Sequence, residues 1–105
     1  FLPVPNLAGR RSVMRGFRAE MGGQFWHEGQ AERSGHLFRW EAKVYPESSA
    51  CGIKGGRVSK LWIAELPPGE VRYWQEVAYY DRGWCTRPLT PAAKAFVDEL
   101  LEHFK

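Results

Sequence analysis

The fold is decided by the stretch Gly55-Gly56-Arg57-Val58-Ser59-Lys60-Leu61-Trp62-Ile63-Ala64. Its side chains alternate in character from Val58 onward, and a period of two is typical of a β-strand with two unlike faces. A turn sequence, Pro67-Pro68-Gly69, follows, and residues 71–81 then predict a second strand. Because a short turn joins the two strands, we expect them to pair antiparallel as the central hairpin of a sheet.

The centre of this turn determines which residues of the hairpin face each other. With Pro68-Gly69 at the centre, the expected cross-strand pairs are Val58–Tyr79, Lys60–Val77, Trp62–Gln75 and Ala64–Tyr73. One face then carries mostly apolar side chains, and we expect that face to be buried. Its members are Val58, Trp62, Ala64, Val71, Tyr73, Val77 and Tyr79.

A second hairpin is predicted upstream, where residues 24–31 and 36–45 flank the favourable two-residue turn Ser34-Gly35. In that register the core side consists of Phe25, His27, Gly29 and Ala31 opposite Val44, Ala42, Trp40 and Phe38. The other side is expected to face solvent, and it consists of Trp26, Glu28 and Gln30 opposite Lys43, Glu41 and Arg39.

A helix is predicted at the end of the chain. Thr90 offers a hydroxyl cap, Pro91 suits the first helical position, and the helix is expected to run to about Phe104. Its apolar stripe has helical spacing and consists of Ala93, Phe96, Val97, Leu100, Leu101 and Phe104. The predicted fold class is therefore α+β: a four-stranded antiparallel β-meander of two hairpins with one C-terminal α-helix packed on one face, ββββα.

The net charge of +3 lies in the N-terminal segment. Residues 1–21 contain four arginines against Glu20, so residues 22–105 have 11 basic and 11 acidic side chains and are neutral. The four basic residues are Arg10, Arg11, Arg15 and Arg18. We expect residues 1–21 to be a basic arm or extension that could form a short helix, and residues 22–105 to be a single α+β domain with 44% apolar residues overall.

Cysteine and histidine usage favours a domain without a metal site or cofactor. Cys51 and Cys85 have neither the number nor the spacing of a disulfide framework, so both are expected to be free thiols. The histidines lie in three separate elements and have no carboxylate or cysteine at ligand spacing. No stretch has the length of a membrane span, and the chain is expected in the cytoplasm. No catalytic residue is predicted.

Candidate binding residues gather around the central hairpin. They are Arg57, Ser59, Lys60, Trp74, Tyr80, Asp81, Arg82 and Trp84. Lys60 stands among apolar side chains, so its amine must either reach an edge of the sheet or pair with a carboxylate such as Asp81. Asp81 could also cap the Gly83 N–H, with Arg57 or Arg82 pairing to it.

The glycines between Gly52 and Lys60 allow two interpretations. Converging backbone N–H groups, with Lys60 and Ser59, could form an anion site. However, the phosphate-loop motif is absent and the loop leads into a strand instead of a helix. The favoured interpretation is that the glycines accommodate positive φ angles at a turn or bulge.

Three motifs carry a resemblance to a known group of proteins. Gly52-Ile53, Gly55-Gly56-Arg57-Val58-Ser59-Lys60-Leu61-Trp62-Ile63 and Tyr80-Asp81-Arg82-Gly83-Trp84 are similar to a family of small uncharacterised proteins of bacterial phages and mobile elements. The resemblance covers about residues 36–104. It implies a single compact domain of unknown role, and it transfers no catalytic residue.

Three functions follow from these patterns, in order of preference. The first is a non-enzymatic interaction module that binds a protein partner, or a second copy of itself, through the open sheet face or edge. Residues Trp26, Leu61, Ile63, Trp74 and Tyr80 would form that open face. The second is nucleic-acid binding through the four arginines and the exposed aromatics. The third is a small-ligand or enzyme site around Arg57, Lys60 and Asp81.

Overall fold

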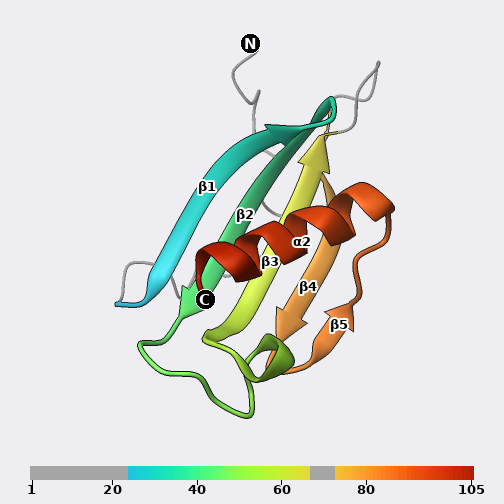
Figure 1. Cartoon of the computed structure of the whole chain (residues 1–105). Helices are drawn as coiled ribbons and strands as arrows, with labels where there is room; N and C mark the ends of the chain where they lie inside the picture. The colour runs from blue at the N-terminus through green and yellow to red at the C-terminus, as the bar shows by residue number, and fades with distance from the viewer. Residues whose placement is uncertain (1–23, 67–72) are drawn as a thin grey trace.

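The structure is a computed structural model that describes residues 24–66 and 73–105. It contains an antiparallel five-stranded sheet in the order β1-β2-β3-β4-β5, with a helix lying across one face (Figure 1). The elements in chain order are β1 (Trp26–Arg33), β2 (His36–Val44), the short 3₁₀ helix η2 (Ile53–Gly55), β3 (Val58–Leu66), β4 (Gln75–Asp81), β5 (Trp84–Thr86) and α2 (Pro91–His103). The expected basic arm, and any helix in it, lies outside the described residues.

The first hairpin confirms the sequence prediction in its turn and its register. Ser34 and Gly35 both have positive φ, 56° and 82°, which is the geometry of a two-residue turn that matches the twist of antiparallel strands. His27 lies opposite Ala42, and Gly29 lies opposite Trp40. The indole of Trp40 lies over Gly29, where an added Cβ would come within 3.1 Å of the ring.

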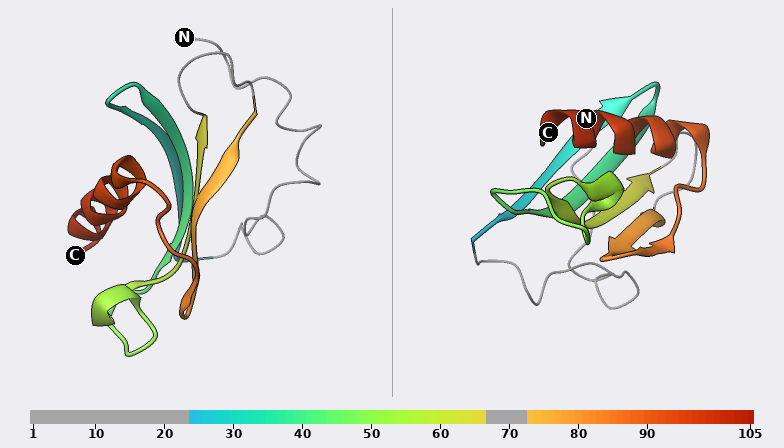
Figure 2. Two further views of the ribbon diagram at one scale, coloured as in Figure 1. Left: turned by 90° about the vertical axis from the view of Figure 1, so that its right-hand side faces the viewer. Right: turned by 60° about the horizontal axis from the view of Figure 1, so that its bottom comes forward.

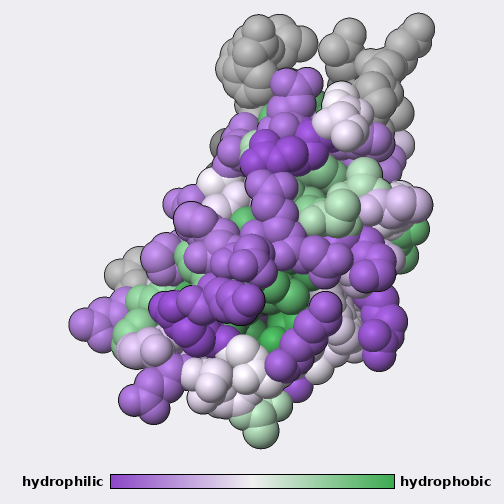
Figure 3. Space-filling view, in the orientation of Figure 1, coloured by the Kyte–Doolittle hydropathy of each residue, from purple (hydrophilic) through white to green (hydrophobic). Residues whose placement is uncertain are grey.

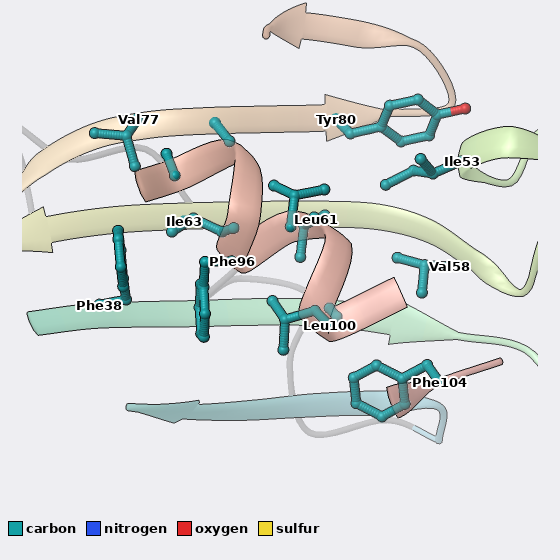
Figure 4. Close-up of a cluster of buried hydrophobic side chains, with 14 of the residues drawn as sticks. Phe38, Ile53, Val58, Leu61, Ile63, Val77, Tyr80, Phe96, Leu100 and Phe104 are labelled. Carbon is teal, nitrogen blue, oxygen red and sulfur yellow. The ribbon is translucent and has the colours of Figure 1, made fainter. Parts of the chain in front are cut away.

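Helix α2 confirms its predicted start and packing. The Thr90 side chain accepts a hydrogen bond of 3.0 Å from the Ala93 N–H, and Pro91 occupies the first turn. The stripe of apolar residues points at the sheet, as Figure 4 shows for Phe96, Leu100 and Phe104. We call this covered surface the helix face and the other surface the reverse face. Figure 2 shows α2 on one side of the curved sheet.

The helix face and α2 enclose the main core. Its buried members are Phe38, Ala42, Val44, Ile53, Val58, Leu61, Ile63, Val77, Ala78, Tyr80, Ala93, Phe96, Val97, Leu100 and Phe104. Viewed from the helix side, hydrophilic residues cover the outward surface of α2, and hydrophobic surface shows between them below the helix (Figure 3). The helix therefore separates most of this core from solvent.

The predicted strand count was wrong, because the sheet has five strands. The chain turns at Arg82, whose φ is 60°, and then returns beside β4 as β5. Strand β5 has only three residues. A period of two cannot be recognised in so short a segment, which explains why the sequence pattern predicted four strands.

The predicted register of the central hairpin was also wrong. Lys60 lies opposite Asp81 and Trp62 lies opposite Tyr79, so the strands are displaced from the predicted pairing. Strand β4 begins at Gln75, which is later in the chain than the sequence pattern suggested. The predicted turn at 67–69 lies outside the described residues, as does Val71.

The predicted faces of β3 were inverted by a β-bulge. Val44 pairs with Val58 and Lys43 pairs with Lys60, so Ser59 is the extra residue. The bulge places Leu61 and Ile63 on the helix face together with Val58. Trp62 and Ala64 instead form a second buried cluster with Trp74, packed against Trp26, Leu37, Leu66 and Tyr79 on the reverse face.

Two further expectations, about contact with α2 and about exposure to solvent, were wrong as a result. Helix α2 was expected to cover Trp40, Trp62 and Tyr79, but only Trp40 contacts it, with its ring centroid 5.7 Å from that of Phe104. Glu41 was expected in solvent, but it is 1% exposed on the reverse face opposite Trp62. The reverse face is therefore neither fully polar nor open at these positions.

Candidate functional site

A row of interacting side chains crosses the reverse face near the loop end of the sheet. Four strands contribute one residue each, because Trp26 lies opposite Lys43, Lys43 opposite Lys60, and Lys60 opposite Asp81. Side chains that lie directly opposite each other in an antiparallel pair are close enough to interact. The register of β1 to β4 therefore brings two cations, one anion and one aromatic ring into a line.

Asp81 is the anionic end of this row. Its Oδ1 lies 3.8 Å from Lys60 Nζ and 3.4 Å from Arg82 Nε. The same oxygen is buried and accepts no hydrogen bond. Arg82 reaches it because the positive φ of this residue turns the chain directly after β4. The two cations therefore neutralise Asp81 by ion pairing, and Lys60 pairs with the carboxylate named for it from the sequence.

Lys43 is the second cation of the row. Its Nζ lies 5.8 Å from the ring centre of Trp26 and 5.4 Å from that of Tyr45. An ammonium group above an aromatic face is attracted by the negative charge density of the ring. These two rings hold the Lys43 amine on the reverse face beside Lys60.

Ser59 completes the site from the bulge of β3. It is 4% exposed, and its Oγ has no hydrogen-bond partner. Its carbonyl oxygen accepts a hydrogen bond of 3.1 Å from the Arg82 N–H, which connects the bulge to the turn after β4. Ser59 borders a hollow of about 470 Å³ whose other lining residues are Lys43, Tyr45, Glu47, Ser49, Cys51, Lys60 and Arg82.

The loop 45–57 closes this end of the domain. The Tyr45 N–H donates to the Arg57 carbonyl at 3.0 Å, so the two ends of the loop are joined. Gly52 packs tightly against Gly56, and a Cβ added to Gly52 would lie 2.0 Å from the Gly56 carbonyl oxygen. Gly55 has a φ of +71°. These positions support the prediction that glycines serve a turn here.

Arg57 lies away from the row and has a structural role. Its Nε donates to the Tyr45 carbonyl at 2.8 Å, and its Nη1 donates to the Lys105 carbonyl at 3.2 Å. The side chain therefore fastens the loop to the end of the chain after α2. It borders a different hollow, of about 580 Å³, between the loop and α2.

Tyr80 and Trp84 lie on the helix face, not beside the row. The Tyr80 hydroxyl donates to the Cys51 carbonyl at 2.8 Å, and the Trp84 ring meets the Tyr80 ring edge-on at 5.1 Å. Burial, with a smaller contribution from the nearby Cys51 thiol, raises the pKa of Tyr80. Both rings close the end of the core.

Trp74 was predicted to lie on an open face and is in fact 5% exposed. It packs with Trp62 and Ala64 at the other end of β4 from Asp81. The eight predicted residues thus divide into two sets. Ser59, Lys60, Asp81 and Arg82 meet in one site, whereas Arg57, Trp74, Tyr80 and Trp84 lie elsewhere.

Sequence reasoning missed Lys43, Tyr45 and Cys51 as members of the site. Lys43 was predicted on the solvent face of the first hairpin. Because the loop 45–57 separates the two hairpins, the sequence did not show that Lys43 lies opposite Lys60. Cys51 and Cys85 are free thiols, as predicted, and both are exposed. Across residues 24–66 and 73–105, no group of three metal-ligating side chains occurs and no helix is long and apolar enough to cross a membrane.

A second candidate region is the outer edge of β1. Within the described ranges, β2 is the one strand that pairs with β1. The edge spans eight residues, and Glu28, Gln30 and Glu32 along it are exposed. The opposite edge, β5, has three residues. A long edge strand presents backbone N–H and C=O groups that can pair with another strand.

These features define a small α+β domain with an open antiparallel sheet, one covering helix and a basic hollow at one end of the reverse face. A family model matches residues 25–105, and the chain belongs to that family, the Domain of unknown function DUF7678. No curated protein and no solved structure matches the chain. The match confirms an uncharacterised family and includes β1, which the resemblance over residues 36–104 did not cover.

Proposed function

We propose that this domain is a non-enzymatic interaction module that pairs with a second copy of itself along the outer edge of β1. The observation that carries the proposal is the length of this edge, eight residues against three at β5. The face originally considered for binding does not support it, because Leu61, Ile63 and Tyr80 are buried in the main core and Trp74 is buried on the reverse face.

The direction of the backbone groups along β1 follows from the turn. In a hairpin with a two-residue turn, the residues that flank the turn, here Arg33 and His36, form backbone hydrogen bonds to each other. Hydrogen-bonded and non-hydrogen-bonded pairs then alternate along the two strands. The Val44 N–H donates to the Phe25 carbonyl at 2.8 Å, which agrees with this alternation. The backbone groups of Glu28, Gln30 and Glu32 are therefore directed away from β2.

The side chains of β1 favour one register of self-pairing. Two antiparallel copies related by a two-fold axis at Gly29 place Glu28 of one copy opposite Gln30 of the other. An axis at Gln30 would instead place Glu28 opposite Glu32, and like charges directly opposite each other are destabilising. Pairing about Gly29 joins the two sheets into one continuous sheet with closed two-fold symmetry.

A proline substitution on this edge tests the proposal. The Gln30 N–H points outward, so Gln30→Pro removes no bond to β2 but blocks a strand added outside β1. Gln30→Ala, which keeps the N–H, is the matched control. Light scattering after size exclusion should give a dimer for the native chain and Gln30→Ala, and a folded monomer for Gln30→Pro. A native monomer at high concentration, or a dimer that survives Gln30→Pro, would contradict the proposal.

The alternative, nucleic-acid binding, is tested on the same proteins. It would use Arg10, Arg11, Arg15 and Arg18, which lie outside the described residues. Titration with oligonucleotides at low salt should detect binding that decreases steeply with salt if phosphate contacts carry it. Binding that is lost when these arginines are replaced, and that is equal in Gln30→Pro and Gln30→Ala, would favour this alternative over edge pairing.

We further propose that the module belongs to a phage or mobile element and acts in the cytoplasm. The resemblance of the Gly52–Trp62 and Tyr80–Trp84 motifs supports an origin in a phage or mobile element. The two free thiols, Cys51 and Cys85, suit the reducing cytoplasm.

A further inference from the structure

We propose that the hollow between η2, β5 and α2 binds a small aromatic acid, a molecule with a flat apolar ring system and one carboxylate. The hollow has a volume of about 310 Å³, and its lining comes from η2, from residues 84–88 and from α2. Figure 2 shows η2 and α2 on the same side of the sheet. The hollow is therefore separate from the reverse face, and the proposal does not depend on pairing along β1.

Most of the lining is apolar. The apolar members are Ile53, Trp84, Pro88, Val97 and Leu101. Ile53 and Val97 are buried, whereas Trp84 is partly exposed. Figure 3 shows hydrophobic surface below the helix. Ligand sites are typically concave with mainly apolar walls and a few polar groups, and this volume is at the small end of their range. The hollow therefore suits a small ligand with an apolar body.

Trp84 favours an aromatic body over an aliphatic one. Its ring meets the ring of Tyr80 at 5.1 Å with an interplanar angle of 80°. Because the two rings meet edge-on, Tyr80 covers at most one face of the indole. A ligand ring that packs against the indole adds attraction beyond the apolar area that it buries.

The charged residues of the lining favour an anion. They are Lys54, Arg87, Lys94 and Asp98. Among the described residues, three cations thus face one acid in this lining, and two positive charges remain in excess. Asp98 pairs with Lys54 through Oδ1 at 3.7 Å and with Lys94 through Oδ2 at 3.6 Å. The other two acids of α2, Glu99 and Glu102, pair with residues outside this lining.

Arg87 is the group that would bind the carboxylate. It is exposed, and within residues 24–66 and 73–105 its guanidinium forms no hydrogen bond or ion pair. A planar guanidinium matches the two oxygens of a carboxylate with two parallel hydrogen bonds. Lys54 and Lys94 add attraction to the anion, because their exposed pairs with Asp98 are weak.

The start of α2 gives a further argument for an anion. The N-terminal end of a helix carries partial positive charge, so acidic residues are stabilising there. The first turn of α2 contains no acidic residue, and Lys94 follows one turn after the Thr90 cap. A carboxylate bound beside Lys94 would supply the negative charge that this end of the helix lacks.

The test is a titration of the full chain with sodium 2-naphthoate, followed by backbone and indole N–H chemical shifts in NMR spectra. We expect saturable shifts at Lys54, Arg87 and the Trp84 indole. 2-Naphthamide keeps the rings but lacks the charge, so it should bind at least tenfold more weakly. Acetate keeps the charge but lacks the rings, so it should bind at least tenfold more weakly as well. Equal affinity for 2-naphthoate and either of these compounds would overturn the proposal.

Arg87→Gln should weaken binding of 2-naphthoate about tenfold, since it removes a charge-assisted pair. The variant should fold normally, because Arg87 is exposed. Arg33→Gln is the matched control, since Arg33 is also exposed but pairs with Glu99 outside this lining. Its replacement should leave the affinity within about twofold, because distant exposed charges are screened. Shifts that stay linear in 2-naphthoate, or equal weakening by the two arginine variants, would contradict the proposed site.

Discussion

On the helix face of the sheet, buried aromatic and aliphatic side chains pack against one another. Phe38 and Phe96 stack with centroids 4.7 Å apart and an interplanar angle of 8°. On the reverse face, buried aromatic residues lie among charged groups. The Trp62 Nε1–H donates to Glu76 at 3.1 Å, and the Thr86 hydroxyl donates to the other oxygen of Glu76 at 3.2 Å. The two faces of one sheet therefore use different interactions.

This difference separates the residues that stabilise the fold from the residues of the candidate site. An apolar core gains free energy in proportion to the area that it removes from water, and it can tolerate many apolar sequences. Buried polar groups instead need particular partners, and each missing partner is costly. The row from Lys43 to Asp81 and the unsatisfied Ser59 hydroxyl both occur in the bulge and turn region that the helix does not cover. We therefore expect substitutions on the helix face to change stability most.

The largest effect on stability is expected for Phe96→Ala. Phe96 is 2% exposed and packs between Phe38 and the rest of the core, so its loss leaves a cavity. We expect the free energy of unfolding to fall by about 3–5 kcal/mol. Urea unfolding followed by circular dichroism measures it. Leu89→Ala is the control, because Leu89 is 65% exposed and should change stability by less than about 0.5 kcal/mol. Equal losses for both variants would contradict a core beneath α2.

The elements that were predicted correctly are those determined by a few residues adjacent in the sequence. Ser34-Gly35 fixes a turn from two adjacent residues, and Thr90-Pro91 fixes the start of α2 from two more. The central hairpin depends on pairing over longer distances. Ser59 is an extra residue opposite β2, and Val77 is an extra residue opposite β3. Nothing in the alternation of side chains marks either bulge, so a register and a face inferred by simple counting were wrong.

A smaller loss of stability than for Phe96→Ala is expected for Trp62→Phe on the reverse face. The substitution keeps an aromatic ring but removes the hydrogen bond to Glu76 and, because Trp62 is 2% exposed, leaves part of the indole volume unfilled. We expect a loss of about 1.5–3 kcal/mol, because hydrogen bonds to charged groups contribute more than neutral ones. Tyr80→Phe is the matched control on the helix face. It removes a bond to the neutral Cys51 carbonyl and should cost about 1 kcal/mol by urea unfolding. A larger loss for Tyr80→Phe would reverse the comparison of the faces.

The candidate site was predictable only in the part contributed by the central hairpin. The pairing of Lys60 with Asp81 was one of two outcomes that the sequence left open, since the amine of a lysine among apolar residues must either reach an edge of the sheet or pair with a carboxylate. Lys43 could not be placed, because the pairing of β2 with β3 is set by the loop 45–57 and the bulge at Ser59. Trp74 lies on the face that the helix does not cover, as predicted, but it is buried there, because the β3 bulge brings Trp62 and Ala64 to the same face.

The smallest effect is expected where the edge of the sheet meets α2. Arg33 at the end of β1 donates from Nε to Glu99 of α2 at 2.9 Å, and both side chains are about half exposed. This hydrogen bond, with the charges of Arg33 and His103 as smaller causes, lowers the pKa of Glu99. Because the pKa of Glu99 is lower in the folded chain than in the unfolded chain, the ionised carboxylate stabilises the fold at a pH above its unfolded pKa. This stabilisation is lost as the pH falls through the lowered pKa of the folded chain.

Glu99→Gln should therefore lower the melting temperature by a few degrees at most at pH 7, because solvent and salt screen exposed pairs. The difference from the native chain should shrink as the pH is reduced below about 4, where the native carboxyl becomes protonated. High salt at pH 7 should shrink it as well. Differential scanning calorimetry across this pH range measures both trends. A difference that grows toward acid would mean that Glu99 does not stabilise the contact between β1 and α2 as a carboxylate.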